Sequence, residues 1–271
     1  MDNPPSVFLA APVKAAPIVL LFALTGQLVQ ESLNPGAFGE YAKRLGRGLL
    51  CSAAGDVFLE FEGAYGHDAL FIGGLLSFLV GHIFYISAFS TGMCLADLAP
   101  FYQAVGATTL YTIGLFGYLY EYLPAPLVLP GFVYASAIAT MAITSICRPL
   151  PPSSKAGNLA ATWSKLSGVV GALIFVVSDS VLAVNKARQT RTVERGAAAA
   201  NSVEPTLLTS PAPLAQFAFP VPGGKDIVMA TYYAGQIGIT LSAWGAKEVV
   251  RDVPVPMPAG VAKEKRAKKA D

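Results

Sequence analysis

Charge is scarce in this sequence of 271 residues. Asp, Glu, Lys and Arg make up only 13% of it, whereas hydrophobic residues make up 54%. A soluble domain carries roughly 25% charged residues, and a water-exposed surface of this size needs them. The mean hydropathy of +0.52 agrees. The composition therefore excludes an ordinary soluble globule and predicts an all-α bundle of membrane-spanning helices.

Several signatures of other protein classes are also missing. The cysteines, Cys51, Cys94 and Cys147, have no CxxC spacing and lie in or beside apolar segments. This disfavours a disulfide framework or a zinc site and predicts buried small side chains. No basic stripe lies beside exposed aromatic residues, so we expect no nucleic-acid partner. The N-terminal stretch has no basic region and no A-x-A site, so we expect no cleaved signal peptide.

Long apolar runs dominate what is present. A helix needs about 20 apolar residues to cross a hydrocarbon core of about 30 Å. Seven segments approach that length, at about 15–33, 45–62, 69–91, 100–121, 126–147, 159–186 and 227–247. The alternative is eight spans, with an additional short helix around Val7–Ala11.

We expect residues 1–250 to form a single transmembrane helical domain. The stretch at about 187–226 is rich in Arg, Pro, Ser and Ala and lacks apolar periodicity, which predicts a flexible loop. Residues 251–271 form a basic tail that we expect to be disordered.

Basic residues predict the orientation, because short cytoplasmic loops carry an excess of Lys and Arg. Three groups fall on one side of a seven-helix bundle: Lys43, Arg44 and Arg47; Arg148, Lys155 and Lys165; and the C-terminal tail. We therefore expect a cytosolic C-terminus. The final "KKAD" is either a di-lysine signal for return to the endoplasmic reticulum or the chance end of a lysine-rich tail.

Ionisable residues inside the expected spans are few, and each is costly in a bilayer. Asp56 and Glu60 lie four residues apart in "GDVFLEF", so they share one face of a helix. Asp179 lies in "FVVSDS" on a distant span. Because two acids remote in sequence converge only when something uses them, we predict functional roles for Asp56 and Asp179.

Other polar residues of these spans are candidates for contacting a substrate. They are Glu60, His82, Tyr85, Ser178, Asn185, Lys186, Tyr232, Tyr233 and Gln236. Each also has a structural interpretation. His82 and Tyr85 then pack helices together, Tyr232 and Tyr233 form an aromatic belt, and Lys186 extends to the membrane interface.

Four segments together resemble the YhhN/TMEM86 family, whose characterised members are lysoplasmalogenases: "LLCSAAGDVFLEF", "GLLSFLVGHIFYISAF", "GALIFVVSDSVLAVNKA" and "YYAGQIGITLSA". The resemblance covers roughly residues 45–186 and 227–247. It implies an integral-membrane hydrolase that cleaves the vinyl ether bond of lysoplasmalogen to a fatty aldehyde and glycerophosphoethanolamine or glycerophosphocholine. It also implies no metal and no organic cofactor, which agrees with the absence of HExxH and GxSxG motifs.

Vinyl ether hydrolysis suits a pair of carboxyl groups. Its slow step is protonation of the β-carbon, which creates an oxocarbenium ion. Catalysis therefore needs a proton donor and a carboxylate that stabilises the cation and activates water, as in glycosidases. We assign Asp56 and Asp179 to these roles without deciding which is which. Glu60 nearby favours a protonated Asp56, and Lys186 favours an ionised Asp179.

In this hypothesis His82 and Tyr85 orient the water or the glycerol hydroxyl, and Lys186 contacts the substrate phosphate. The alternative function is a membrane transporter or channel, in which the intramembrane acids and His form a proton or substrate path. A lipid-binding or scaffolding protein is a further alternative, but it leaves the two aspartates unexplained.

Overall fold

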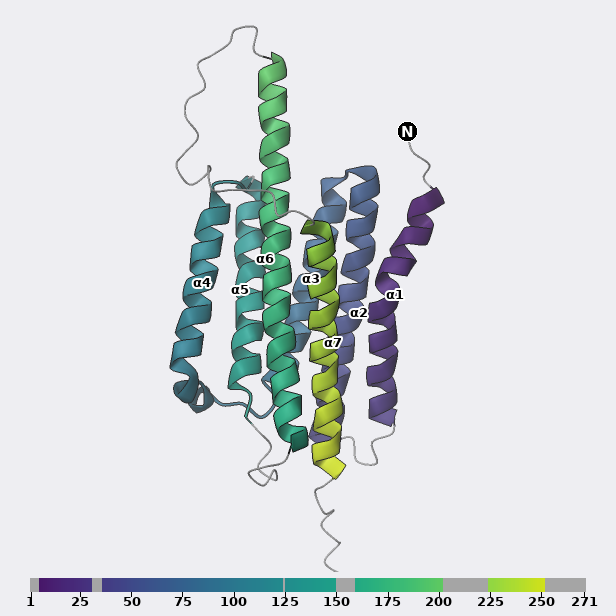
Figure 1. Cartoon of the computed structure of the whole chain (residues 1–271), viewed down its shortest axis with the longest axis vertical. Coiled ribbons are helices and arrows are strands. Elements are labelled where there is room, and N and C mark those ends of the chain that lie inside the picture. Colours follow the sequence, from purple (N-terminus) through teal and green to yellow (C-terminus); the bar gives the residue numbers. More distant parts are fainter. Residues whose placement is uncertain (1–4, 31–35, 124, 150–158, 202–223, 252–271) are drawn as a thin grey trace, which may run out of the picture.

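The computed structural model describes residues 5–30, 36–123, 125–149, 159–201 and 224–251. Within these ranges the elements are α1 (Pro5–Gln30), α2 (Gly36–Tyr65), α3 (Asp68–Phe89), the 3-10 helix η1 (Leu95–Phe101), α4 (Tyr102–Tyr120), α5 (Ala125–Cys147), α6 (Leu159–Asn201) and α7 (Gly224–Arg251). The helices run side by side, alternately up and down (Figure 1). The predicted all-α bundle is confirmed.

Four of the described helices are long and apolar enough to cross a membrane by length and composition. They are Val7–Gln30, Ala69–Phe89, Ala125–Cys147 and Leu159–Asn185. Helices α2, α4 and α7 are more polar, but they run alongside those four in the same bundle (Figure 1). The shortest, α4, has 19 residues and is about 28 Å long, which matches the hydrocarbon thickness. The chain is a multi-pass helical membrane protein.

Helix α1 begins well before the predicted first span at 15–33. Residues 7–11 are part of its first turns rather than a separate helix, so the eight-span alternative finds no support in the described residues. The helix continues through Pro12 and Pro17, which membrane helices tolerate because neighbouring groups satisfy the freed backbone. Lys14 consequently lies inside the first helix.

The flexible loop predicted at about 187–226 is wrong for its first part. Helix α6 continues to Asn201, and α7 begins at Gly224. The stretch "RTVERGAAAA" contains four alanines and two arginines, which favour helix even without an apolar stripe. In Figure 1 α6 extends beyond the ends of its neighbours. Residues 202–223 and the tail after Arg251 lie outside the described residues.

The cysteines fit the prediction of buried small side chains only in part. Cys147 is buried and Cys51 is half-buried, but Cys94 is exposed. The backbone N–H of Cys94 donates a hydrogen bond of 2.7 Å to Oδ2 of Asp97, at the start of η1. This hydrogen bond lowers the pKa of the Asp97 carboxyl group. Cys94 therefore belongs to a surface turn, not to the core.

Helices α6 and α7 approach each other closely at glycines. A Cβ atom on Gly171 would lie only 2.6 Å from the backbone nitrogen of Ile239 and 2.7 Å from the carbonyl oxygen of Gly235. A Cβ atom on Gly238 would lie 2.7 Å from Cα of Gly171. Small residues permit this backbone contact between membrane helices. It fixes the two helices that carry Asp179 and Tyr232.

This contact predicts that replacing glycine with alanine has opposite effects on the stability of the protein at two positions. Gly171→Ala should lower the free energy of unfolding by about 1–3 kcal/mol, because the new methyl group meets backbone atoms that have no room to move. Gly117→Ala, in α4, should raise it by up to about 1 kcal/mol, because nothing lies within 4 Å of that added atom. Thermal unfolding of the purified variants in one detergent measures both. A gain in stability for Gly171→Ala would contradict the packing described here.

Candidate functional site

Asp56 lies in the core of the bundle, on the face of α2 that meets α7. Only 3% of the residue is exposed. Its Oδ2 accepts a hydrogen bond of 2.8 Å from the hydroxyl of Tyr232, which is itself buried. A polar group in such surroundings is costly without a partner. Tyr232 supplies that partner and fixes the orientation of the carboxyl group.

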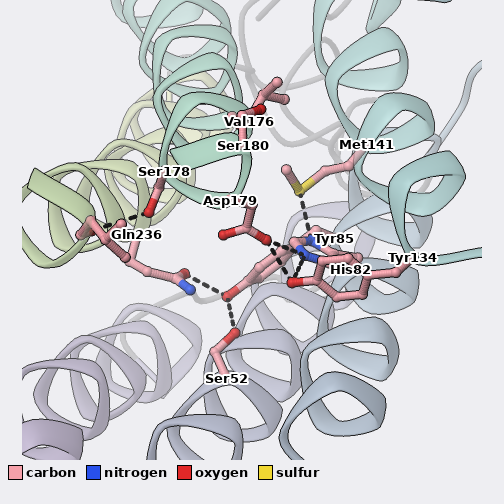
Figure 2. Close-up of polar contacts among 11 residues, drawn as sticks. Ser52, His82, Tyr85, Tyr134, Met141, Val176, Ser178, Asp179, Ser180 and Gln236 are labelled. Carbon is pink, nitrogen blue, oxygen red and sulfur yellow. Dashed lines mark hydrogen bonds and ion pairs between the residues drawn. The ribbon is translucent and has the colours of Figure 1, made fainter. Parts of the chain in front are cut away.

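Asp179 lies on α6 and has two neighbours from other helices. The hydroxyl of Tyr134, on α5, donates a hydrogen bond of 2.6 Å to its Oδ2. Nε2 of His82, on α3, lies 3.8 Å from the same oxygen and 3.4 Å from the Tyr134 hydroxyl. Because Tyr134 gives its hydrogen to Asp179, the Nε2–H of His82 is the donor to the Tyr134 oxygen. Figure 2 shows this arrangement.

Phe175 connects the surroundings of the two aspartates. Its fully buried ring makes edge-to-face contacts with Tyr232 and with His82, at centroid distances of 5.4 Å and 5.0 Å. Such contacts are favourable between aromatic rings. The carboxyl groups of Asp56 and Asp179 also interact electrostatically. The fold thus brings two acids from distant parts of the sequence into one region of the core.

Tyr85 and Gln236 form a second buried polar contact beside Asp179. The Tyr85 hydroxyl donates a hydrogen bond of 2.7 Å to Oε1 of Gln236, and Oγ of Ser52 lies 3.5 Å from the same hydroxyl. Figure 2 shows Asp179, Tyr85 and Gln236 pointing toward one another from α6, α3 and α7. Nε2 of Gln236 is buried and has no hydrogen-bond partner among the described residues. A buried donor in this state is costly, and the same amide interacts with the Tyr232 hydroxyl.

Three further predicted residues make contacts away from the two aspartates. Oγ of Ser178 donates to the carbonyl oxygen of Val228 at 3.1 Å, which joins α6 to α7. The Tyr233 hydroxyl donates to the carbonyl oxygen of Lys14 at 2.8 Å. Glu60 pairs with the same lysine, at 3.3 Å between Oε2 and Nζ. Ser178 therefore acts as a helix-packing residue, while Glu60 and Tyr233 tie α1 to α2 and α7.

Asn185 and Lys186 lie further along α6 than Asp179. Asn185 is half-buried, and no contact in the described part of the chain connects it with either aspartate. The side chain of Lys186 lies outside the described residues. Its predicted contacts with Asp179, with the interface or with a phosphate group stay predictions.

Sequence reasoning missed Tyr134 and Lys14. Tyr134 lies in "GFVYASAIAT", and nothing in that apolar pattern separates it from the tyrosines that serve at membrane interfaces. Lys14 lies one residue before the predicted first span at 15–33. Extending that span back through Pro12 would have placed a lone charge in a membrane helix, which is a signal for function.

The site offers groups suited to proton transfer. Its two carboxyl groups, one imidazole, tyrosine hydroxyls and an amide are held in an otherwise apolar core, which is the setting of general acid–base chemistry. Within the described residues no three His, Cys, Asp or Glu side chains gather closely enough to hold a metal ion.

Comparison with known proteins identifies relatives of this chain. It is 28% identical to lysoplasmalogenase TMEM86A of Bos taurus over 260 residues, which cover 90% of this chain and 82% of that protein. It is 30% identical to lysoplasmalogenase TMEM86B of Sus scrofa, over 89% of this chain and 77% of that protein. With lysoplasmalogenase TMEM86A of Homo sapiens it shares 28% identity, over 77% of this chain and 68% of that protein.

No solved structure matches this chain. The model of the YhhN family matches residues 9–201, a range that includes both aspartates, His82 and Tyr134. The resemblance predicted from the four sequence segments is confirmed, and the chain belongs to the YhhN family.

Proposed function

We propose that this protein is a hydrolase of the vinyl ether bond in lysoplasmalogen. The observation that carries the proposal is the pair of Asp56 and Asp179, each hydrogen-bonded to a tyrosine in one apolar core. The relatives named lysoplasmalogenase support the substrate class. The products are a fatty aldehyde and glycerophosphoethanolamine or glycerophosphocholine.

The two carboxyl groups divide the reaction between them. One delivers a proton to the β-carbon, where the electrons of the double bond form the new C–H bond and leave an oxocarbenium ion. The other, as a carboxylate, stabilises that cation and takes a proton from the water that attacks the α-carbon. The resulting hemiacetal breaks its bond to the glycerol oxygen, which receives the proton that the base took from water. The hemiacetal hydroxyl gives its own proton to the carboxylate that acted as the acid, and the aldehyde is released.

The surrounding residues position these groups. Tyr232 and Tyr134 each hold one carboxyl group by a hydrogen bond, so little reorganisation is needed when charge develops in the transition state. His82 fixes Tyr134 in turn. The buried amide hydrogens of Gln236 are suited to bind the glycerol hydroxyl, because a hydroxyl oxygen accepts what that amide donates.

We propose that the bundle is oriented in its membrane with the C-terminal tail in the cytosol. Basic residues at the start of α2, the end of α5 and the start of α6 support the orientation, because they share the end of the bundle at which α7 finishes (Figure 1). These residues are Lys43, Arg44, Arg47, Arg148 and Lys165.

Removing either acid should abolish the reaction. Asp56→Asn and Asp179→Asn should each lower the rate of aldehyde release by about 100-fold or more, the usual contribution of a general acid or base. The measurement is aldehyde formation from lysoplasmalogen by purified protein. Asp97→Asn is the matched control, because Asp97 is half-buried in η1, where its carboxyl group accepts the Cys94 hydrogen bond far from both core acids. This variant should leave the rate unchanged. Full activity in either core variant would refute the assignment.

The substrate bond itself gives a second test. The wild-type protein should release aldehyde from lysoplasmalogen and leave the saturated alkyl-ether analogue intact, because only the vinyl ether has a carbon that accepts a proton. Movement of lysoplasmalogen across liposomes without any aldehyde would instead support the transporter or channel alternative.

The tyrosine beside Asp179 should matter through its hydroxyl alone. Tyr134→Phe removes the hydrogen bond to the carboxyl group and should lower kcat roughly tenfold, the effect of losing a hydrogen bond to a charged group. Tyr111→Phe is the control, because it removes an exposed hydroxyl that donates to Ser180 at 2.8 Å. That variant should stay within about twofold of wild type. Equal rates for the two variants would exclude a positioning role for Tyr134.

A further inference from the structure

Lys14 is an unusual residue for its position in α1. It is the one charged residue between Val7 and Gln30, in a helix apolar enough to cross a membrane. Its side chain is 22% exposed, and its Nζ lies 3.3 Å from Oε2 of Glu60, whose side chain is 33% exposed. A charge in such a helix usually marks a functional site.

Two series of contacts, one along α2 and one along α7, connect Lys14 with the proposed catalytic pair. Along α2, Glu60 follows Asp56 by one turn, a rise of about 6 Å. Along α7, Tyr233 donates a hydrogen bond to the Lys14 backbone, and its ring lies 5.3 Å from that of Tyr232, the partner of Asp56. Lys14 also interacts electrostatically with Asp56. A cation is therefore held about one helical turn from a proposed catalytic carboxyl group.

The order of Asp56 and Lys14 along the bundle matches the order of the ether bond and the phosphate group in a lysophospholipid. Because α2 ends at Tyr65, Glu60 and its partner Lys14 lie nearer than Asp56 to the turn between α2 and α3, at the upper end of the bundle in Figure 1. A lysophospholipid in the membrane leaflet at that end of the bundle has its phosphate group nearer to the membrane surface than its ether bond. Glycerol joins the two by a few single bonds of about 1.5 Å each, a span comparable to one helical turn.

We propose that Lys14 binds the phosphate group of the lysophospholipid while the vinyl ether bond lies between Asp56 and Asp179. This inference rests on the proposed function and names the group that recognises the substrate headgroup. A lysine ammonium is a common ligand of phosphate. Glu60 holds the ammonium in place until the phosphate displaces it, since an ion pair with this much exposure contributes little stability.

The test compares two substrates, one with a phosphate-containing headgroup and one without any headgroup. Lys14→Gln should raise KM for lysoplasmalogen about tenfold or more, as expected for loss of one charge-assisted hydrogen bond, and leave kcat nearly unchanged. The same variant should cleave the neutral 1-alkenylglycerol with wild-type kcat/KM. Lys43→Gln is the matched control, because Lys43 pairs with Glu40 at 3.7 Å at the other end of α2; both substrates should behave as with wild type.

Two more variants make the test independent of folding. Lys14→Arg keeps the charge and should preserve the preference for the phosphate-bearing substrate. Glu60→Gln removes the competitor for the lysine and should increase the ratio of kcat/KM for lysoplasmalogen to that for 1-alkenylglycerol. This ratio is informative because any effect of Glu60 on Asp56 acts on both substrates alike.

Binding of the saturated alkyl-ether lysophospholipid separates this inference from the proposed function. Its affinity for the full-length protein should fall about tenfold in Lys14→Gln, whether or not the wild-type protein cleaves lysoplasmalogen. A binding loss without any cleavage by the wild type would sink the proposed function and leave the phosphate site standing. Equal losses for both cleavable substrates, or unchanged binding of the analogue, would show that Lys14 only joins α1 to α2 and would overturn the inference.

Discussion

The arrangement of the core follows from the burial of two carboxyl groups. A membrane interior offers no water to Asp56 or Asp179, so every polar contact they need has to come from another helix. Tyr232 on α7 meets one need and Tyr134 on α5 the other. Helices α2, α5, α6 and α7 must therefore keep a fixed relation to one another. The glycine contact between α6 and α7 supplies part of that rigidity.

The same requirement explains why the bundle contains a separate polar layer in an otherwise apolar core. The Tyr85 hydroxyl donates to Gln236 and lies 3.5 Å from Oγ of Ser52. Nε2 of His82 lies 3.4 Å from the Tyr134 hydroxyl, and its Nδ1 lies 3.4 Å from Sδ of Met141. Each of these side chains comes from a helix that also packs beside one of the aspartates or beside its tyrosine partner. Rotation of any one helix would leave several buried groups without partners, which gives the core one well-defined arrangement.

The sequence predicted the helices and identified Asp56 and Asp179 as acids within expected spans, because both features leave strong local signals. An apolar run of the right length predicts a span, and a carboxyl group within it is costly enough to be noticed. Tyr134, Phe175 and Lys14 left weaker signals. A tyrosine or phenylalanine in an apolar helix is ordinary, so their importance depends on which helices become neighbours. Prolines before residue 15 concealed Lys14, and the polar composition after residue 186 concealed the continuation of α6.

The position of Phe175 affects how protons can move between Asp56 and Asp179. Tyr232 gives its single hydroxyl hydrogen to Asp56, and Tyr134 gives its own to Asp179. The hydrocarbon edge of Phe175 stands between Tyr232 and His82. Among the described residues no chain of hydrogen bonds links the two acids. In the proposed reaction, a proton that one acid gives up therefore returns to it through the substrate, the product or water rather than through a series of protein groups.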